Sequence, residues 1–356
     1  MTRLSSLPAG KTVLTSTSPS GALTVTISNK EESALVEVNS MLSSSFNVDA
    51  SKHHGKVIGD AWFGGTSWSS DERYFAYVSS PKKEKPRTLF DTATSDDSAK
   101  YSKKFEFEQD WGEKYVGVDQ LQITILDTRS GDLFLVPHIG RHQDTAGQPV
   151  WIPNSYELCF TGWSSSPHRL GMIYCFQRPC SLFTYDATAL LTSRGADNGA
   201  TVKFLTEELS LARSGRVDPS GERVVFLGRE SALESHGGNF QLFSKSLADR
   251  SLPPEIIVDL VPRSDSNTDE FPGIFCSNLP LNCFLDASTV LFTSTWRSMN
   301  TIVKVDVRTK EVSKFPMSEI YEDSGSSDDW NRHTDRSATL MDICTKYMVV
   351  VTSTPN

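Results

Sequence analysis

A polar turn followed by a short apolar strand recurs at long intervals along this chain, and this repeat constrains the fold more than any other sequence feature. The clear copies lie at residues 67–77, 150–160, 216–226 and 283–292, and a weaker copy lies at 17–25. Measured between Trp68, Trp151, Val217 and Phe284, which stand at equivalent places, the steps are 83, 66 and 67 residues. A further copy begins at 340–344. Such a repeat predicts a modular fold in which each copy contributes one unit.

Each unit also contains a hairpin closed by a short polar turn, with clear copies at 123–136 and 302–312. Short runs rich in β-branched and aromatic residues predict strands at 74–78, 122–126, 133–136, 158–161, 223–227, 290–293 and 301–305. We therefore expect an all-β protein, a β-propeller of four-stranded antiparallel blades. The steps exceed the roughly 40–50 residues of common propeller repeats, which indicates long insertions, one of them a loop at about 82–104. A multi-sheet sandwich is the alternative fold.

The composition limits the classes of partner. With 38% hydrophobic and 10% aromatic residues, the 356-residue chain can bury a sizeable core. Its net charge of −9 argues against nucleic acid and anionic lipid as partners, because both attract a basic surface. No apolar run approaches the roughly 18 residues of a membrane helix, and the first 25 residues lack a signal-peptide pattern. We expect a cytoplasmic protein that binds neither nucleic acid nor membrane.

The sequence lacks the motifs of common catalytic and cofactor sites. An α/β-hydrolase carries its serine in a G-x-S-x-G turn, and the nearest segment, residues 64–68, has Trp68 in place of the second glycine. No P-loop, GxGxxG or HExxH pattern occurs, and no Cys/His group has zinc spacing. We therefore expect no cofactor and no metal. An acidic and aromatic cluster at 106–113 either presents carboxylates to a cationic ligand or forms a strand, a turn at Gly112 and an exposed rim.

Several segments resemble one enzyme family, the acylaminoacyl peptidases, which are serine peptidases similar to prolyl oligopeptidase. The segments contain Asp-Trp-Gly-Glu at 110–113, His-Gly-Lys-Val at 54–57, Gly-Trp at 162–163 followed by Pro-His-Arg-Leu-Gly at 167–171, and Val-Asp-Leu-Val-Pro-Arg at 258–263 leading into 273–281. They occur in the family order, and the resemblance extends over nearly the whole chain, from about residue 18 to 356.

The resemblance implies a seven-bladed N-terminal propeller that precedes a C-terminal α/β-hydrolase domain in a cytosolic, oligomeric enzyme. That enzyme releases an N-acyl amino acid from short N-acylated peptides, and the propeller restricts access to small substrates. The catalytic serine, aspartate and histidine belong to the hydrolase domain, so no residue of this chain inherits a catalytic role. We expect residues 1–356 to form one propeller that is incomplete at both ends, with part of the first blade missing and the last blade cut near 340–356.

Four residues are candidates for substrate contact at the tunnel that the resemblance implies: Trp163, Arg169, Asp110 and Glu113. Trp163 would pack against a small apolar side chain of the substrate, or else between blades. Arg169 would pair with a peptide carboxylate, since its planar guanidinium suits bidentate recognition, or else with a neighbouring loop.

Three functions remain open at this stage. The leading hypothesis is a non-catalytic propeller that gates and orients N-acylated peptides for a hydrolase domain, in a protein that forms homo-oligomers. The second is a stand-alone propeller that serves as a protein-interaction scaffold. The third is an independent enzyme of another type.

Overall fold

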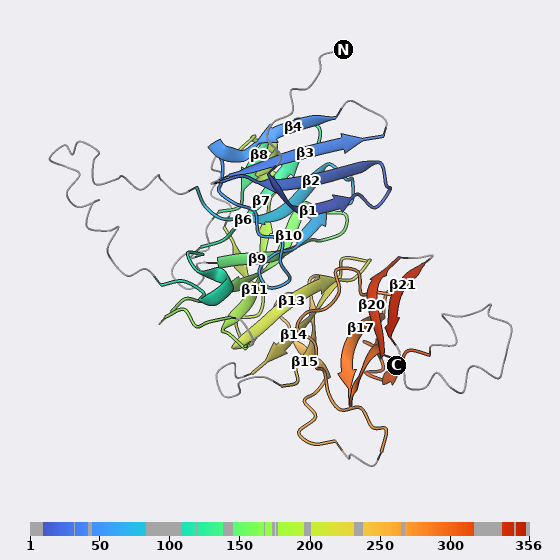
Figure 1. The fold of residues 1–356 in the computed structure, drawn as a ribbon. Coiled ribbons are helices and arrows are strands. Elements are labelled where there is room, and N and C mark those ends of the chain that lie inside the picture. Colours follow the sequence, from blue (N-terminus) through green and yellow to red (C-terminus); the bar gives the residue numbers. More distant parts are fainter. Residues whose placement is uncertain are drawn as a thin grey trace.

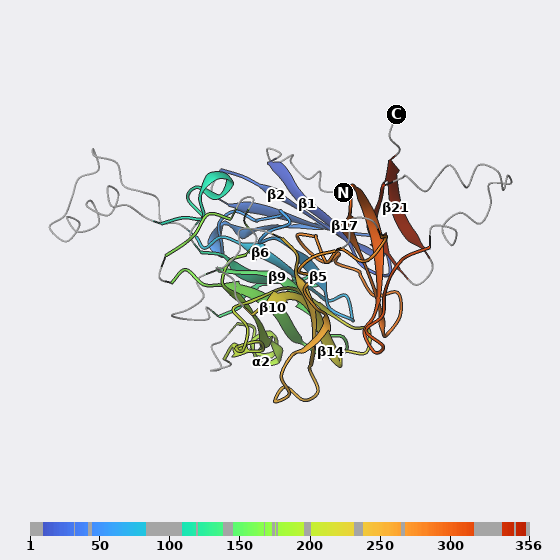
Figure 2. The same cartoon turned by 90° about the horizontal axis from the view of Figure 1, so that it is seen from below.

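The computed structural model describes residues 10–353 apart from 32, 42–44, 83–108, 119, 138–144, 167, 173–174, 176, 196–200, 231–237, 265–267, 317–336 and 345–346. Strands dominate, and they group into successive antiparallel units that follow one another around a common centre (Figures 1 and 2). The expected long loop at 82–104 falls almost entirely outside the described residues.

The first two units are four-stranded sheets in sequence order. The first contains β1 (Lys11–Thr17), β2 (Leu23–Asn29), β3 (Ala34–Ser40) and β4 (Phe46–Asp49). The second contains β5 (Thr66–Trp68), β6 (Tyr74–Ser79), β7 (Gln122–Asp127) and β8 (Leu133–Leu135). The weak repeat at 17–25 thus belongs to a sheet with four strands, and the incompleteness of the propeller at its two ends stays a prediction.

The third and fourth units are joined into one sheet by a parallel pair, Cys180 with Leu211. The third contains β9 (Thr145–Trp151), β10 (Glu157–Trp163), β11 (Cys180–Asp186) and β12 (Lys203–Phe204), with the short helix α2 (Thr188–Thr192) after β11. The fourth contains β13 (Leu211–Val217), β14 (Arg223–Arg229), β15 (Gln241–Ser246) and β16 (Glu255–Val258).

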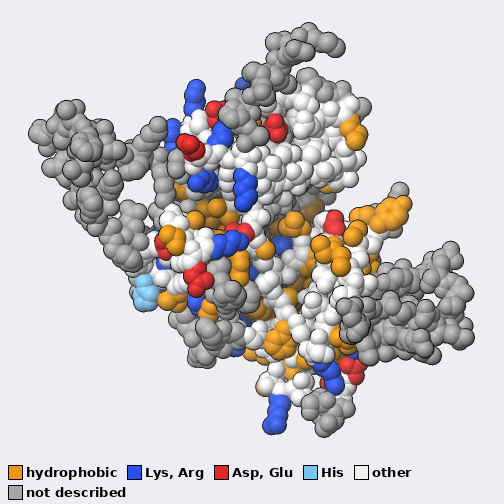
Figure 3. Space-filling model, in the orientation of Figure 1, with side chains coloured by type: hydrophobic (Ala, Val, Ile, Leu, Met, Phe, Trp, Pro, Cys, Tyr) orange, Lys and Arg blue, Asp and Glu red, His pale blue; other side chains and the backbone are white. Residues whose placement is uncertain are grey.

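The last units contain fewer strands among the described residues. β17 (Thr289–Trp296), β18 (Met299–Asp306) and β19 (Val312–Lys314) form a three-stranded sheet, and β20 (Ser337–Ile343) pairs with β21 (Met348–Ser353). The repeat that begins at 340–344 therefore lies in β20. Figure 3 shows apolar side chains on the surface formed by this two-stranded sheet. The exposed ones are Met341, Tyr347, Val349 and Val351.

The middle strands are buried on both faces because each sheet packs against two different neighbours. All six residues of β6 are buried. Phe75 and Tyr77 belong to the apolar cluster shared with the first sheet, whereas Tyr74 and Ala76 belong to the cluster shared with the third. Side chains alternate between the faces of a strand, so one strand supplies two separate interfaces. A two-sheet sandwich packs each sheet on one side only, and this alternation identifies a β-propeller.

The strand predictions are confirmed, and so is the all-β propeller with four-stranded blades. Each predicted strand lies within or overlaps a strand of the structure, from β6 to β18. The number seven for the blades stays a prediction. Within the described part of the chain, no helix is both long and apolar enough to cross a membrane.

The up-and-down order of the strands divides the connections between two faces of the propeller. Because neighbouring strands in each blade are antiparallel, loops that leave the second and fourth strands emerge on one face, and turns after the first and third emerge on the opposite face. In the described part of the chain, the first face, here called the long-loop face, has the connections that begin after β4, β6, β10 and β16. The second face has the short turns near 18–22, 69–73, 127–132 and 218–222. The four candidate residues all belong to the long-loop face or lie at its edge.

Candidate functional site

Trp163 ends β10 and is fully buried. Its ring meets Phe63 edge-on, with ring centroids 4.9 Å apart, and Phe63 also contacts Tyr115 at 4.9 Å and Trp111 at 5.4 Å. The four aromatic side chains form one cluster beneath the long loops. Trp163 therefore packs in the interior of this structure, and its contact with a substrate side chain stays a prediction.

Asp110 and Glu113 lie in the loop at 109–118, which the aromatic cluster anchors. Trp111 donates from Nε1 to Thr145 Oγ1 at 3.3 Å, while Tyr115 ends the 3₁₀ turn η2 (Glu113–Tyr115). Gly112 has φ 69°, a backbone conformation that glycine adopts without a steric penalty. The described part of the acidic and aromatic cluster, residues 109–113, thus turns at Gly112, and residues 106–108 lie outside the described residues.

The Asp110 carboxylate stabilises this loop. Its Oδ2 accepts a hydrogen bond from the Gly117 amide at 2.8 Å, and its Oδ1 accepts one from the Gly112 amide at 2.9 Å. These two backbone bonds, the Gly117 bond first, lower the pKa of Asp110, and the charge of Arg169 acts in the same direction. Asp110 and Arg169 are therefore electrostatic neighbours. Glu113 is exposed at the same turn.

Arg169 ties the loop at 164–179 to the loop at 109–118. Its backbone amide donates to Gln109 Oε1 at 2.9 Å, and its Nη1 donates to the Gln109 carbonyl at 2.5 Å. Arg178 closes the other side of its own loop by donating from Nε to the Gly171 carbonyl at 2.8 Å. The structure therefore brings Asp110 and Arg169 together, with Glu113 exposed on the turn beside Asp110.

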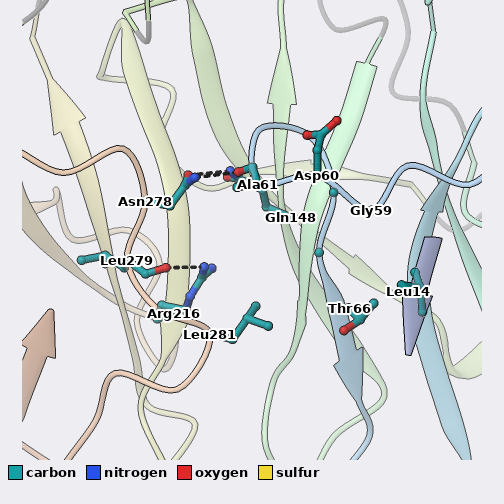
Figure 4. Close-up of a pocket in the computed structure, with 12 residues that line it drawn as sticks. Leu14, Gly59, Asp60, Ala61, Thr66, Gln148, Arg216, Asn278, Leu279 and Leu281 are labelled. Carbon is teal, nitrogen blue, oxygen red and sulfur yellow. Dashed lines mark hydrogen bonds between the residues drawn. The ribbon is translucent and has the colours of Figure 1, made fainter. Parts of the chain in front are cut away.

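A second site, which the sequence analysis missed, lies where the inner strands of the blades meet. A cavity of about 320 Å³ is lined by residues from β1, the loop at 59–65, β5, β9, β13 and the segment at 278–281 (Figure 4). Its lining residues are Leu14, Gly59, Asp60, Ala61, Gly64, Gly65, Thr66, Gln148, Arg216, Asn278, Leu279 and Leu281. Four blades thus contribute to one cavity.

The segment at 277–281 crosses this centre and is held there by buried polar side chains. Arg213 Nη2 donates to the Ser277 carbonyl at 2.6 Å, and Asn278 Nδ2 donates to the Ala61 carbonyl at 2.6 Å. The Leu279 amide donates to Ser214 Oγ at 2.9 Å. These bonds connect β13 and the loop at 59–65 through a segment that contains no strand of its own.

Arg216 is buried at the edge of the same cavity and donates only to backbone carbonyls. Its Nε bonds to Pro280 O at 2.5 Å, Nη1 to Gly215 O at 2.7 Å and Nη2 to Leu279 O at 2.7 Å. Burial lowers the pKa of Arg216 to about 10, and it also lowers the pKa of the neighbouring Arg213. The sequence signal that could have found this site is the pair of arginines, three positions apart, just before a predicted interior strand.

No metal centre is evident in the part of the chain that the structure describes. Within those residues, no group of three or more His, Cys, Asp or Glu side chains is arranged to hold a metal ion. The arrangement of the two sites suits binding through charge and hydrogen bonds, since the functional groups present are guanidinium, carboxylate and amide.

Comparison with known proteins agrees with the resemblance seen in the sequence. The chain is 31% identical over 379 residues to the acylamino-acid-releasing enzyme of Mus musculus, covering 98% of this chain and 48% of that protein. It is 32% identical over 327 residues to acylamino-acid-releasing enzyme 1 of Oryza sativa subsp. japonica, covering 83% of this chain and 42% of that protein. The chain therefore spans about half the length of the curated relatives that it matches.

Solved structures show more distant similarities. Pyrococcus horikoshii acylaminoacyl peptidase is 12% identical with a TM-score of 0.48, covering 86% of this chain and 38% of that chain. The β-propeller domain of the Trilobed protease from Pyrococcus furiosus is 13% identical with a TM-score of 0.47, covering 96% of this chain and 78% of that chain. Residues 6–351 match the family described as "Acylamino-acid-releasing enzyme, N-terminal domain". The chain thus belongs to the acylamino-acid-releasing enzyme family and carries its N-terminal β-propeller domain.

Proposed function

We propose that this propeller gates and orients short N-acylated peptides for an α/β-hydrolase domain that releases the N-acyl amino acid. The observation that carries the proposal is the family match over residues 6–351, which assigns this chain the N-terminal domain of a releasing enzyme. The sequence contains no G-x-S-x-G motif, which agrees with a nucleophile that belongs to the hydrolase domain. The proposal includes the cytoplasmic location and the homo-oligomer that the family resemblance implies.

The geometry supports both parts of this role. Gating is favoured because the segment at 277–281 crosses the centre, where it borders a cavity of about 320 Å³. Orientation is favoured because the long-loop face presents a guanidinium, Arg169, on a loop whose position is held by Gln109. A guanidinium in a defined position can select a peptide carboxylate.

The test uses a complete enzyme in which this propeller is joined to a hydrolase domain of the family. In the Arg169→Ala variant, kcat/KM for an acetylated dipeptide with a free carboxylate should fall about 10- to 100-fold, because a charge-assisted bond contributes roughly 1.5–3 kcal/mol. The kcat/KM for an uncharged acetylated amino-acid anilide should stay nearly unchanged. The propeller chain alone, which we expect to be inactive, provides the blank.

Arg178→Ala is the matched control because Arg178 holds the same loop without contacting Gln109. Selective loss of the dipeptide reaction in Arg169→Ala but not in Arg178→Ala supports the proposed orientation. Equal losses on both substrates, or equal effects of the two variants, would restrict Arg169 to a loop-stabilising role and favour the scaffold hypothesis.

A further inference from the structure

The central cavity combines one buried cation with apolar walls. Arg216 lines it, and so do Leu14, Leu279 and Leu281, from β1 and from the segment at 278–281 (Figure 4). Leu279 is 2% exposed, whereas Leu281 is 55% exposed and lies at the solvent side. At about 320 Å³, the cavity has the size at which small-molecule sites begin, roughly 300 Å³.

The charge of Arg216 has no carboxylate to balance it among the described residues. Its partners are three carbonyl oxygens, from Pro280, Gly215 and Leu279. A guanidinium has five N–H groups, so these bonds leave donors for a ligand. A buried charge without a counter-ion is costly, and an anion that enters the site reduces that cost. The lowered pKa of Arg216, caused by burial, agrees with an environment that lacks negative charge.

The one carboxylate in the cavity lining lies away from Arg216. In Figure 4 the Asp60 carboxylate points away from Arg216. Its Oδ1 accepts hydrogen bonds from the backbone amides of Trp62, at 2.8 Å, and Phe63, at 3.2 Å. These bonds keep the Asp60 carboxylate turned into its own loop, and they leave the Arg216 end of the cavity free of negative charge.

We propose that this cavity binds a small carboxylic acid with an apolar side chain. The carboxylate would face Arg216, and the side chain would pack against Leu14, Leu279 and Leu281. The Thr66 hydroxyl and the Asn278 amide nitrogen complete the polar lining and suit a short amide in the same ligand. The Gln148 amide bonds only within the protein. This inference goes beyond the proposed function, because the binding is a property of the propeller and requires no hydrolase domain.

The experiment titrates a small ligand into the 356-residue chain and measures the binding affinity by calorimetry or ligand-observed NMR. The probe is N-acetyl-leucine, and its uncharged analogue N-acetyl-leucinamide differs only in the carboxylate. We expect the amide to bind at least about 10-fold more weakly, and we expect the affinity for the acid to fall as salt is raised. Equal affinities for the two compounds, or no binding of the acid, would overturn the proposal.

A matched pair of variants locates the site without disturbing the Arg216 bonds. Leu281 is exposed at the cavity, so Leu281→Asp adds a negative charge there and Leu281→Asn adds a side chain of nearly the same shape without charge. Leu281→Asp should weaken N-acetyl-leucine binding at least about 10-fold, and Leu281→Asn should weaken it no more than about 3-fold, because like charges repel strongly near a buried cavity. Equal effects of the two variants would place the binding elsewhere. No hydrolysis is measured, so this result is independent of the test of the proposed function.

Discussion

Gln148 joins four segments of the chain through a single amide. Its Oε1 accepts from Thr161 Oγ1 and from the Ser214 amide, both at 2.9 Å, and its Nε2 donates to Trp62 O at 2.9 Å and to Asn278 Oδ1 at 3.0 Å. The residue is 5% exposed and has φ 53°, which is uncommon for a side chain of this size. At the residue scale, one side chain thus organises the centre of the propeller.

The Gln148→Leu substitution should be strongly destabilising. It retains the approximate shape of the side chain but removes hydrogen-bond partners from several buried polar groups, each of which costs about 1–3 kcal/mol when it is left unsatisfied. We expect the free energy of unfolding, measured with urea, to fall by roughly 3–5 kcal/mol. Gln122→Leu is the matched control, because Gln122 Nε2 is buried without a hydrogen-bond partner in the described structure. Comparable losses in the two variants would contradict the role assigned to Gln148.

At the scale of elements, β9 approaches the loop at 59–65 so closely that only glycine fits at one position. A Cβ atom on Gly147 would lie 2.1 Å from the Phe63 carbonyl oxygen and 3.1 Å from the ring of Trp163. The main obstacle is backbone, which cannot rotate away as a side chain can. This close approach of Gly147 to Phe63 places the Phe63 ring against Trp163. It therefore connects the third blade to the loop that lines the central cavity.

We expect Gly147→Ala to destabilise the protein by at least about 3 kcal/mol, since β9 or the loop would have to move. Gly171→Ala is the control, because a Cβ atom there would meet nothing within 4 Å. Thermal unfolding of both variants provides the measurement. A Gly147→Ala protein that unfolds at the temperature of the Gly171→Ala protein would show that the contact is looser than described.

The hairpin turns depend on aspartates that occupy equivalent positions. Asp127, at the end of β7, accepts from the Arg129 amide at 2.9 Å, and Asp306, at the end of β18, accepts from the Arg308 amide at 2.8 Å. Asp127 Oδ2 also accepts a hydrogen bond from Arg73 Nη2 at 2.8 Å. Burial alone would raise the pKa of Asp127, but the Arg73 guanidinium and the turn amides lower it on balance.

This shift predicts acid sensitivity of defined sign. A carboxylate whose pKa is lowered on folding stabilises the protein fully above the unfolded value of about 3.9, and that contribution is lost as pH falls below it. In Asp127→Asn the decrease in unfolding free energy between pH 7 and pH 3 should therefore be smaller than in the unchanged chain. Urea unfolding at the two pH values measures this, and Glu311→Gln, in the exposed turn before β19, controls for the loss of one negative charge. An unaltered pH dependence in Asp127→Asn would contradict the prediction.

At the scale of the whole molecule, the blades do not present equal surfaces. β6 and β7 contribute side chains to apolar clusters on both faces of their sheet, whereas β21 pairs with β20 alone among the described residues. Val349 and Val351 on β21 are 54% and 55% exposed. Exposed apolar strands of this kind are sites of self-association.

We therefore expect the 356-residue chain to self-associate, and Val351→Lys should reduce this because a charge on an exposed strand opposes pairing between chains. Light scattering against protein concentration gives the measurement. Leu252→Lys changes an equally exposed apolar residue outside the sheets, at 51% exposure, and should leave association unchanged. Equal effects of the two substitutions, or a monodisperse monomer in the unchanged chain, would contradict an association through β21.

The sequence by itself determined the strands, the turns and the family. Alternation along segments such as 74–78 predicts strands because neighbouring side chains point to opposite faces, and the aspartates at 127 and 306 mark turns because their carboxylates bond to nearby amides. These effects are local, so each can be predicted from the sequence of one segment. Asp110, Glu113 and Arg169 were grouped as candidates only through the family resemblance, and the structure shows electrostatic proximity for Asp110 and Arg169.

Only the tertiary structure decided where the interior polar side chains lie. Gln148, Arg216 and Asn278 are 68 and 62 residues apart in sequence, and they meet because successive blades place their inner strands around one centre. The burial of Trp163 likewise depends on Phe63, which comes from another blade's connecting loop. A cavity is a property of side chains brought together by packing between blades, and no periodicity within a single segment encodes which of them will share it.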